Sequence, residues 1–272
     1  MACLEPRPSR RRVRPRRVAD FVADEIRGHV LSGRFPRDTV LPRQELLLDT
    51  YAVSPPSLRE ALRILEAEGL ATTIRGNVGG VQLHPPRPEK VAYLLAMVLQ
   101  DRAVAYQDLV SSLGDLEALC AALAAAREDR DAVVATLRDR LDHSRTVFFD
   151  TVEYVRSARA FHSDLVRASG SGTLEVIVGV VETVFSSQVY EFLHGEVNQA
   201  AFADLAMREE CLATHTAITD AIAAGDVSRA AQLTRDHMQE PTKQSLLPPD
   251  LVIDSNAVRG DMTDRRDRPD LQ

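Results

Sequence analysis

Helical spacing of the apolar residues runs through residues 91–240, and this pattern restricts the fold of the chain more than any other feature. Apolar side chains recur there every three or four positions, and no alternating strand pattern interrupts them. Seven helices are predicted, at residues 91–100, 106–127, 131–148, 151–168, 174–193, 202–224 and 227–239. Because helices without a sheet bury their apolar stripes against one another, this segment predicts an antiparallel bundle of six or seven helices.

Residues 18–84 show a different order of elements. An apolar stripe with helical spacing runs from Val18 to Val30 and ends at a serine, a glycine and a proline. The elements predicted after it are helices at 43–51 and 54–68 and β-prone segments at 71–74 and 81–83, which flank the glycine-rich residues 75–80. Because Asn and Gly tolerate positive φ, this glycine-rich stretch favours a hairpin turn. Three helices and a hairpin are the outline of a winged helix-turn-helix, so the whole chain is predicted to be mostly α.

The net charge of −7 is divided unevenly along the 272 residues. Residues 1–86 hold 14 arginines against 10 acidic residues, whereas the rest of the chain holds 19 basic and 30 acidic residues. A basic front on an acidic body indicates that one end meets a polyanion. Residues 5–17 carry seven arginines and almost no apolar residues. Residues 1–17 are therefore predicted to be a disordered basic arm, either an inert leader or a segment attracted to phosphates.

The remaining boundaries follow from proline content and polarity. Residues 85–90 are rich in proline and predict a linker between a first domain at 18–84 and a second at 91–240. Residues 241–272 are polar, contain further prolines, and predict a disordered tail.

Composition also excludes several classes of protein. No apolar run approaches the roughly 18 residues of a membrane-spanning helix, and no apolar region follows the N-terminal arginines, so neither a membrane protein nor a secreted one is expected. Cys3, Cys120 and Cys211 lie far apart and show no CxxC spacing. This pattern argues against a disulfide scaffold or a cysteine zinc site and favours a reducing cytoplasm.

The predicted helix at 54–68 has features of a recognition helix. Ser54 is a good N-cap, and the following proline is tolerated at the first helical position. Arg59 and Arg63 lie one turn apart, away from the apolar stripe. The first turn, with Ser54, Ser57 and Arg59, can reach base edges and phosphates. Periodicity alone favours an ordinary surface helix, but the helix-turn-helix spacing and the glycine-rich wing shift the balance towards DNA binding.

The segment from Leu41 to Gly80 resembles the winged-helix head of the GntR family of bacterial transcription regulators. The sequences LREAL and LEAEGL, followed by RGNVGG, carry the resemblance. It implies that Arg59 contacts the operator, with Ser54 and Ser57 beside it, and that the wing around Gly76 enters the minor groove or clamps its phosphates. The DNA-contacting residues expected on these grounds are Arg43, Ser54, Ser57, Arg59, Arg63, Arg75, Gly76 and Asn77.

Two positions depart from the family pattern. Pro55 and Glu45 stand where the family usually has arginines. The loss of two positive charges should weaken phosphate contact and reduce the salt dependence of binding. The basic arm at residues 1–17 is a candidate to compensate for that loss.

A helical domain after such a head resembles the FadR-type subgroup, whose FCD domain binds an effector inside a bundle of helices. Its members commonly hold a divalent metal with an Asp-x3-His pair and two further histidines. His162, His215 and His237 match the three histidines, but Ala158 stands at the position of the acid. The three histidines either hold zinc or a similar ion, more weakly and with strong pH dependence, or line an effector pocket without a metal.

The same resemblance bears on the effector. Subgroup members that recognise small carboxylates often carry an arginine four residues before the glutamate of the first long helix. Here Glu117 matches the glutamate, and Leu113 occupies the arginine position. Leu113 therefore favours a larger or more apolar effector, such as a fatty acid or an acyl-coenzyme A, although apolar residues of this helix are also typical of plain core.

The resulting hypothesis is a cytoplasmic bacterial repressor that is associated with the nucleoid when bound to DNA. It would form a homodimer, bind double-stranded DNA at a palindromic operator, respond to a small-molecule effector, and have no catalytic or membrane role. Two alternatives are an architectural DNA-binding dimer with a vestigial pocket and a metal enzyme that uses the three histidines.

Overall fold

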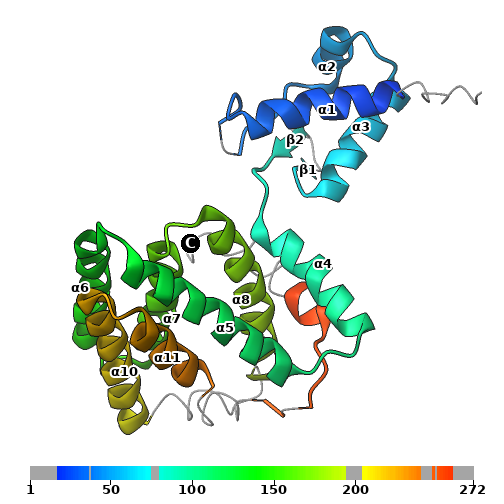
Figure 1. Ribbon diagram of the computed structural model, residues 1–272. Coiled ribbons are helices and arrows are strands. Elements are labelled where there is room, and N and C mark those ends of the chain that lie inside the picture. The colour runs from blue at the N-terminus through cyan, green and yellow to red at the C-terminus, as the bar shows by residue number, and fades with distance from the viewer. Residues whose placement is uncertain are drawn as a thin grey trace, which may run out of the picture. The chain divides into compact units, whose positions relative to one another are not determined.

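The chain divides into two compact units, Met1–Lys90 and Val91–Gln272, in a computed structural model (Figure 1). The structure describes residues 17–36, 38–74, 80–193, 204–239, 247–248 and 250–259. Nearly all of the predicted basic arm lies outside these residues. So do Arg75, Gly76 and Asn77 of the predicted wing.

The first unit is a winged helix-turn-helix. Its elements are α1 (Val18–Leu31), α2 (Gln44–Tyr51), α3 (Pro55–Glu68), β1 (Ala71–Ile74) and β2 (Gly80–Leu83). The two strands are antiparallel, with Thr72 opposite Gln82. One apolar core joins α1, α2, α3 and the strands, and Ile26, Leu58 and Leu65 are completely buried in it. The predicted order of three helices and a hairpin is confirmed.

Local chemistry fixes both ends of α3. The side chain of Ser54 accepts a hydrogen bond from the backbone N–H of Ser57, and Pro55 occupies the first helical position, so the N-terminus is capped as the sequence predicts. Gly69, with φ of 79°, ends the helix in the left-handed conformation that glycine adopts without a steric penalty. The turn between α2 and α3 uses Ala52 in a left-handed conformation, with φ of 50°.

The described part of the second unit is built from helices, as predicted. It contains most of α4 (Pro88–Asp101) and all of α5 (Tyr106–Ala126), α6 (Arg130–Thr146), α7 (Thr151–Ala168), α8 (Gly172–Leu193), α10 (Leu205–Ala224) and α11 (Val227–Met238). The central helix is α5, which contacts α7, α8, α10 and α11. Since α4 begins at Pro88, the last three residues of the predicted linker at 85–90 are already helical; proline is accepted in the first turn of a helix.

The prediction of a disordered tail is wrong for the described part of residues 247–259. Leu247, Ile253 and Val258 are buried against α4, α5 and α8. The backbone N–H of Tyr106 donates to the carbonyl oxygen of Leu251 at 2.7 Å, and that of Ile253 donates to the carbonyl oxygen of Val104 at 3.2 Å. A few apolar side chains in a mostly polar stretch are enough to dock it, because each one fills a site on an existing apolar surface. We call residues 247–259 the C-terminal strap.

The expectation that no segment is apolar and long enough to span a membrane also needs correction. Both α5 and residues 172–189 of α8 reach that length and hydropathy. Buried residues make up 56% of the apolar window of α5, which is the central helix of the bundle and carries the buried carboxylate of Glu117. Its apolar character is that of a core helix surrounded by other helices.

Candidate functional site

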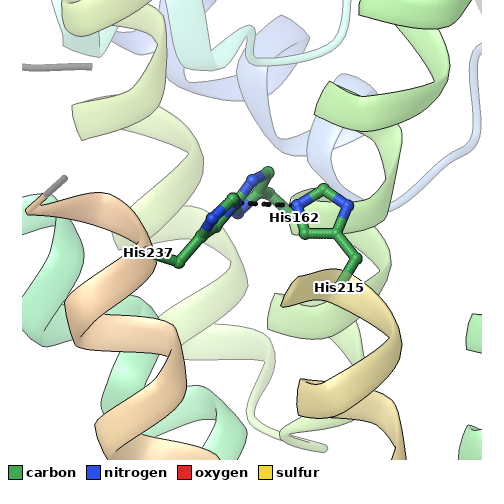
Figure 2. Close-up of side chains that lie close together, drawn as sticks. All are labelled: His162, His215 and His237. Carbon is green, nitrogen blue, oxygen red and sulfur yellow. Dashed lines mark hydrogen bonds between the residues drawn. The ribbon is translucent and has the colours of Figure 1, made fainter. Parts of the chain in front are cut away.

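Three helices bring His162, His215 and His237 together (Figure 2). His162 lies on α7, His215 on α10 and His237 on α11, and one potential ligand atom from each lies within 4.8 Å of the others. Nε2 of His215 and Nε2 of His237 are 2.8 Å apart. The ring of His162 stacks on that of His237 with an interplanar angle of 6°. The structure thus assembles the histidines that the sequence singled out.

The positions of α10 and α11 explain how this cluster forms. Gly225, with φ of 71°, ends α10, and the side chain of Asp226 caps α11 by accepting from the backbone N–H of Arg229. This tight corner places His215 and His237 on facing sides of the two helices. On the other side, α11 approaches α5 closely at Gly114, where an added Cβ would lie 2.9 Å from Cβ of Met238.

Glu117 orients one member of the cluster. Its side chain is 2% exposed, and its Oε2 lies 2.6 Å from Nδ1 of His162. A carboxylate at that distance accepts the Nδ1 proton, which leaves Nε2 of His162 as the basic nitrogen. Hydrogen bonds of this kind fix ring orientation and raise the basicity of histidines that bind metals. Glu117, which the resemblance assigned to the effector pocket, therefore lies directly behind the cluster.

A cavity of 140 Å³ opens beside the histidines. Its wall is mostly apolar and includes Leu113, Phe185, Val189 and Met238, whereas Arg159, Glu182, Arg208 and Glu210 supply the remaining charges. Leu113 and Glu117, both predicted as pocket residues, line it together with His162 and His237. The arrangement is that of a small-molecule site, an apolar space with a few polar groups at one side.

Ala158 also lines this cavity. It lies one helical turn before His162 on α7, the position at which the metal-binding pattern has an acid. Its methyl group offers no ligand atom, so α7 supplies no acid ligand beside His162.

The donor set fits a divalent metal. In a tetrahedral zinc site with Zn–N bonds of about 2.0–2.1 Å, two ligating nitrogens are separated by about 3.3–3.4 Å. The Nε2 atoms of His215 and His237 are 2.8 Å apart, which is the length of a hydrogen bond between them. A small outward shift of one ring would widen this distance enough to accommodate an ion. Neutral imidazoles with a carboxylate behind one of them suit zinc and related ions.

The first unit presents the predicted DNA-contacting residues on its surface. Arg43, Ser54 and Arg59 are exposed, and Ser57 is half-buried. The side chain of Arg63 is 74% exposed and lies 3.7 Å from Glu60. Arg59 and Arg63 border a hollow of 380 Å³ between α3, β1 and β2. The backbone N–H of Thr73 donates to Oε1 of Glu66 at 2.8 Å and ties the first strand of the wing to α3.

Sequence reasoning missed most polar residues of the cavity wall, among them Tyr154, Arg208 and Cys211. Tyr154 donates from its hydroxyl to the carbonyl oxygen of Arg208 at 2.7 Å, and the guanidinium of Arg208 lies over the Tyr154 ring. Cys211 lies beside His215, with 3.8 Å between Sγ and Nε2. Of these three, only Cys211 could have been predicted from the sequence. A cysteine four residues before a histidine lies on the same face of a helix, and both side chains can bind a metal.

Comparisons with known proteins decide the family. The profile described as bacterial regulatory proteins, gntR family, matches residues 18–79, and that of the FCD domain matches residues 108–240. The chain belongs to the gntR family. This GntR regulator is 26% identical over 222 residues to the HTH-type transcriptional repressor GlaR of Escherichia coli K12, an alignment that covers 79% of this chain and 90% of that protein.

Two further proteins show the same likeness. An uncharacterized HTH-type transcriptional regulator of Mycobacterium tuberculosis is 32% identical over 133 residues, which cover 48% of the GntR regulator described here and 52% of the relative. The structure of Streptococcus agalactiae GntR superposes with a TM-score of 0.57 at 18% identity, over 83% of this chain and 99% of that one. That superposition shows the fold alone.

Membership of this family establishes the general role. The protein is a transcriptional regulator whose GntR head implies binding to DNA and whose FCD domain implies binding of a small-molecule effector. The family is one of regulators and not of enzymes.

Proposed function

We propose that the protein is a cytoplasmic, homodimeric repressor that binds a palindromic operator and leaves it when an effector enters the cavity beside the three histidines. The exposed, N-capped turn of α3 with Arg59 is the observation that carries the DNA-binding part of this proposal. In a two-fold dimer, two such helices enter successive major grooves of the operator. Effector and operator affinities are then linked, because each ligand favours its own arrangement of the dimer.

An apolar stripe on α4 supports the dimer. Val91, Leu94, Met97 and Val98 are each between 45% and 52% exposed, and their spacing places them on one side of the helix. A contiguous exposed stripe of large apolar residues is typical of a surface that another protein covers. We expect a Leu94→Glu variant to be monomeric in light scattering, while a Glu89→Gln variant near the start of the same helix remains a dimer.

The cavity supports an effector with an apolar body. Leu113 is 1% exposed and contributes its side chain to a wall that is mostly apolar. An acyl chain fits such a wall better than a small hydroxy acid does, because the latter needs polar partners for each hydroxyl group. A divalent metal held by the three histidines would offer a positive charge to the acid group of such an effector.

The test of the DNA-binding part uses an operator selected from random duplexes with the full chain. Arg59→Ala should weaken binding and lower the salt slope by about two, since each of the two protomers loses one phosphate contact. Arg138→Ala, which removes an exposed arginine of α6, is the control and should change neither. If no palindromic sequence is enriched, or if the Arg59 variant binds like the control, this part of the proposal is wrong.

The basic arm is tested in the same assay. Deletion of residues 1–17 removes seven arginines and should reduce both affinity and salt dependence. An unchanged salt slope would show that the arm does not contact phosphates.

The effector part is tested by adding octanoate, palmitate and palmitoyl-coenzyme A to the operator complex. Release of the operator by at least one of them, and its loss in a Leu113→Arg variant, is the expected outcome. Operator binding that none of a broad set of metabolites changes would favour an architectural role with a vestigial pocket.

A further inference from the structure

The side chain of Cys211 lies at the edge of the histidine cluster, where neither the metal-binding pattern of the family nor CxxC spacing assigns it a role. It is one helical turn before His215 on α10, so both side chains share a face of the helix. Its Sγ lies 3.8 Å from Nε2 of His215. The same nitrogen is 2.8 Å from Nε2 of His237, so the thiol and the second imidazole approach one common atom.

The distance from Sγ of Cys211 to Nε2 of His215 is close to that of a tetrahedral site with one sulfur ligand. With a Zn–S bond of about 2.3 Å and a Zn–N bond of about 2.0–2.1 Å, sulfur and nitrogen are separated by about 3.5 Å. The observed 3.8 Å is close to that separation. Sγ does not belong to the group of ligand atoms that all lie within 4.8 Å of one another, so the Cys211 side chain would have to turn toward the other two histidines when a metal binds. Cys211 also lines the cavity with His162 and His237, so its side chain borders the space into which those two histidines open.

The position of Cys211 mirrors that of the missing acid. An acid at residue 158 would stand four residues before His162 on α7, and Cys211 stands four residues before His215 on α10. Because Ala158 has only a methyl group on the cavity wall, α7 supplies no second ligand, and α10 carries a ligand-type side chain in the equivalent relation to its own histidine.

We propose that Cys211 is the fourth ligand of a divalent metal held by His162, His215 and His237, and that it takes the place of the acid missing at residue 158. The inference rests on the metal binding included in the proposed function and names the ligand that completes that site. Three imidazoles and a thiolate select zinc or cobalt over magnesium and manganese, which prefer oxygen ligands. The thiol loses its proton when the metal binds.

The experiment uses the full chain, reduced and stripped of metal with a chelator, in a Cys3→Ala background. Zinc affinity is measured by competition with a chromophoric chelator, and the cobalt-loaded protein is examined for the near-ultraviolet band of a thiolate bound to cobalt. The parent protein should bind one metal and show the band. Cys211→Ala should lose the band and bind zinc at least about tenfold more weakly, since loss of an outer partner alone costs that much.

Cys120→Ala is the matched control. Cys120 is completely buried on α5, and burial raises the pKa of its thiol to about 11, so it remains protonated and inert. This variant should keep both the band and the affinity. Adding Ala158→Asp to Cys211→Ala should restore affinity without the band, because an oxygen ligand then fills the vacant coordination position.

The outcomes separate this inference from the wider proposal. If Cys211→Ala keeps the band or binds zinc as tightly as the parent, three histidines suffice and the assignment of Cys211 is overturned. If the parent binds no stoichiometric zinc or cobalt, both this inference and metal binding fail, while operator release by acyl ligands still tests the rest of the proposed function. Far-ultraviolet circular dichroism and operator binding confirm that each variant is folded.

Discussion

At the scale of single residues, Glu117 shows how a buried carboxylate can prepare a site. It is 2% exposed and contacts His162 at 2.6 Å, so its charge is compensated by the imidazole N–H. Glu117→Gln keeps the shape but removes the charged acceptor that holds the imidazole ring of His162. We expect zinc affinity to fall by about 10- to 100-fold, measured by competition with a chromophoric chelator.

Glu182→Gln serves as the control for this prediction, because Glu182 lines the same cavity. Equal losses in the two variants would mean that general charge in the cavity, and not the contact with His162, determines affinity.

The sequence predicted the histidines of the site better than their surroundings. A resemblance at three separate motifs identified His162, His215 and His237, and the resemblance to the subgroup's first long helix singled out Leu113 and Glu117. Cys211 was not predicted as a site residue, because its spacing from the other cysteines matches no metal-binding pattern. Arg208 could not have been identified, because its burial depends on contacts with Phe148 and Thr151, about 60 residues away along the chain.

At the scale of elements, the turn between α2 and α3 contains a backbone conformation that its residue does not favour. Ala52 has φ of 50°, and this left-handed conformation costs an L-residue about 1–2 kcal/mol that glycine avoids. Ala52→Gly should therefore stabilise the first unit, by up to about 1 kcal/mol after the entropic cost of glycine. Hydrogen exchange should slow in residues 44–68. Ala103→Gly, at the same φ between α4 and α5, should slow exchange in the second unit only.

The contact between α5 and α11 depends on the missing side chain of Gly114. A methyl group there would lie 2.9 Å from Cβ of Met238, the residue after His237, so α11 would have to shift. Gly114→Ala should lower stability by about 1–3 kcal/mol and weaken zinc binding as well. Gly179→Ala, on α8 with no atom within 4 Å, is the control and should be neutral or slightly stabilising in thermal melts. A melt of Gly114→Ala unchanged from the parent would contradict the close packing.

Helix positions were largely predictable, because each helix follows a 3.6-residue apolar period. The elements that the sequence misplaced are those whose structure depends on distant partners. The C-terminal strap is held by Gln188 and Gln100, whose side chains hydrogen-bond to residues 254 and 255. The local sequence of a polar, proline-containing stretch does not indicate which distant residues will bind it.

At the scale of the whole molecule, the C-terminal strap contributes to the stability of the second unit. Leu247, Ile253 and Val258 are each at most 2% exposed, and burying such a side chain contributes about 1.5–3 kcal/mol. Deleting residues 247–272 should therefore lower the melting temperature clearly and speed hydrogen exchange in α4 and α5. Deleting residues 260–272 leaves every described contact of the strap in place and should have little effect. Equal melting of the two truncated chains would contradict a stabilising role.

The place of the strap in the chain also determines when folding can finish. The first unit has its complete core once residue 90 has been made, so it can fold while synthesis continues. The apolar face of α4, α5 and α8 must wait for residues 247–259, which leave the ribosome after every helix of the bundle. The nascent protein therefore has a folded DNA-binding head before its effector domain is closed, and that open apolar face is the surface that a chaperone would meet.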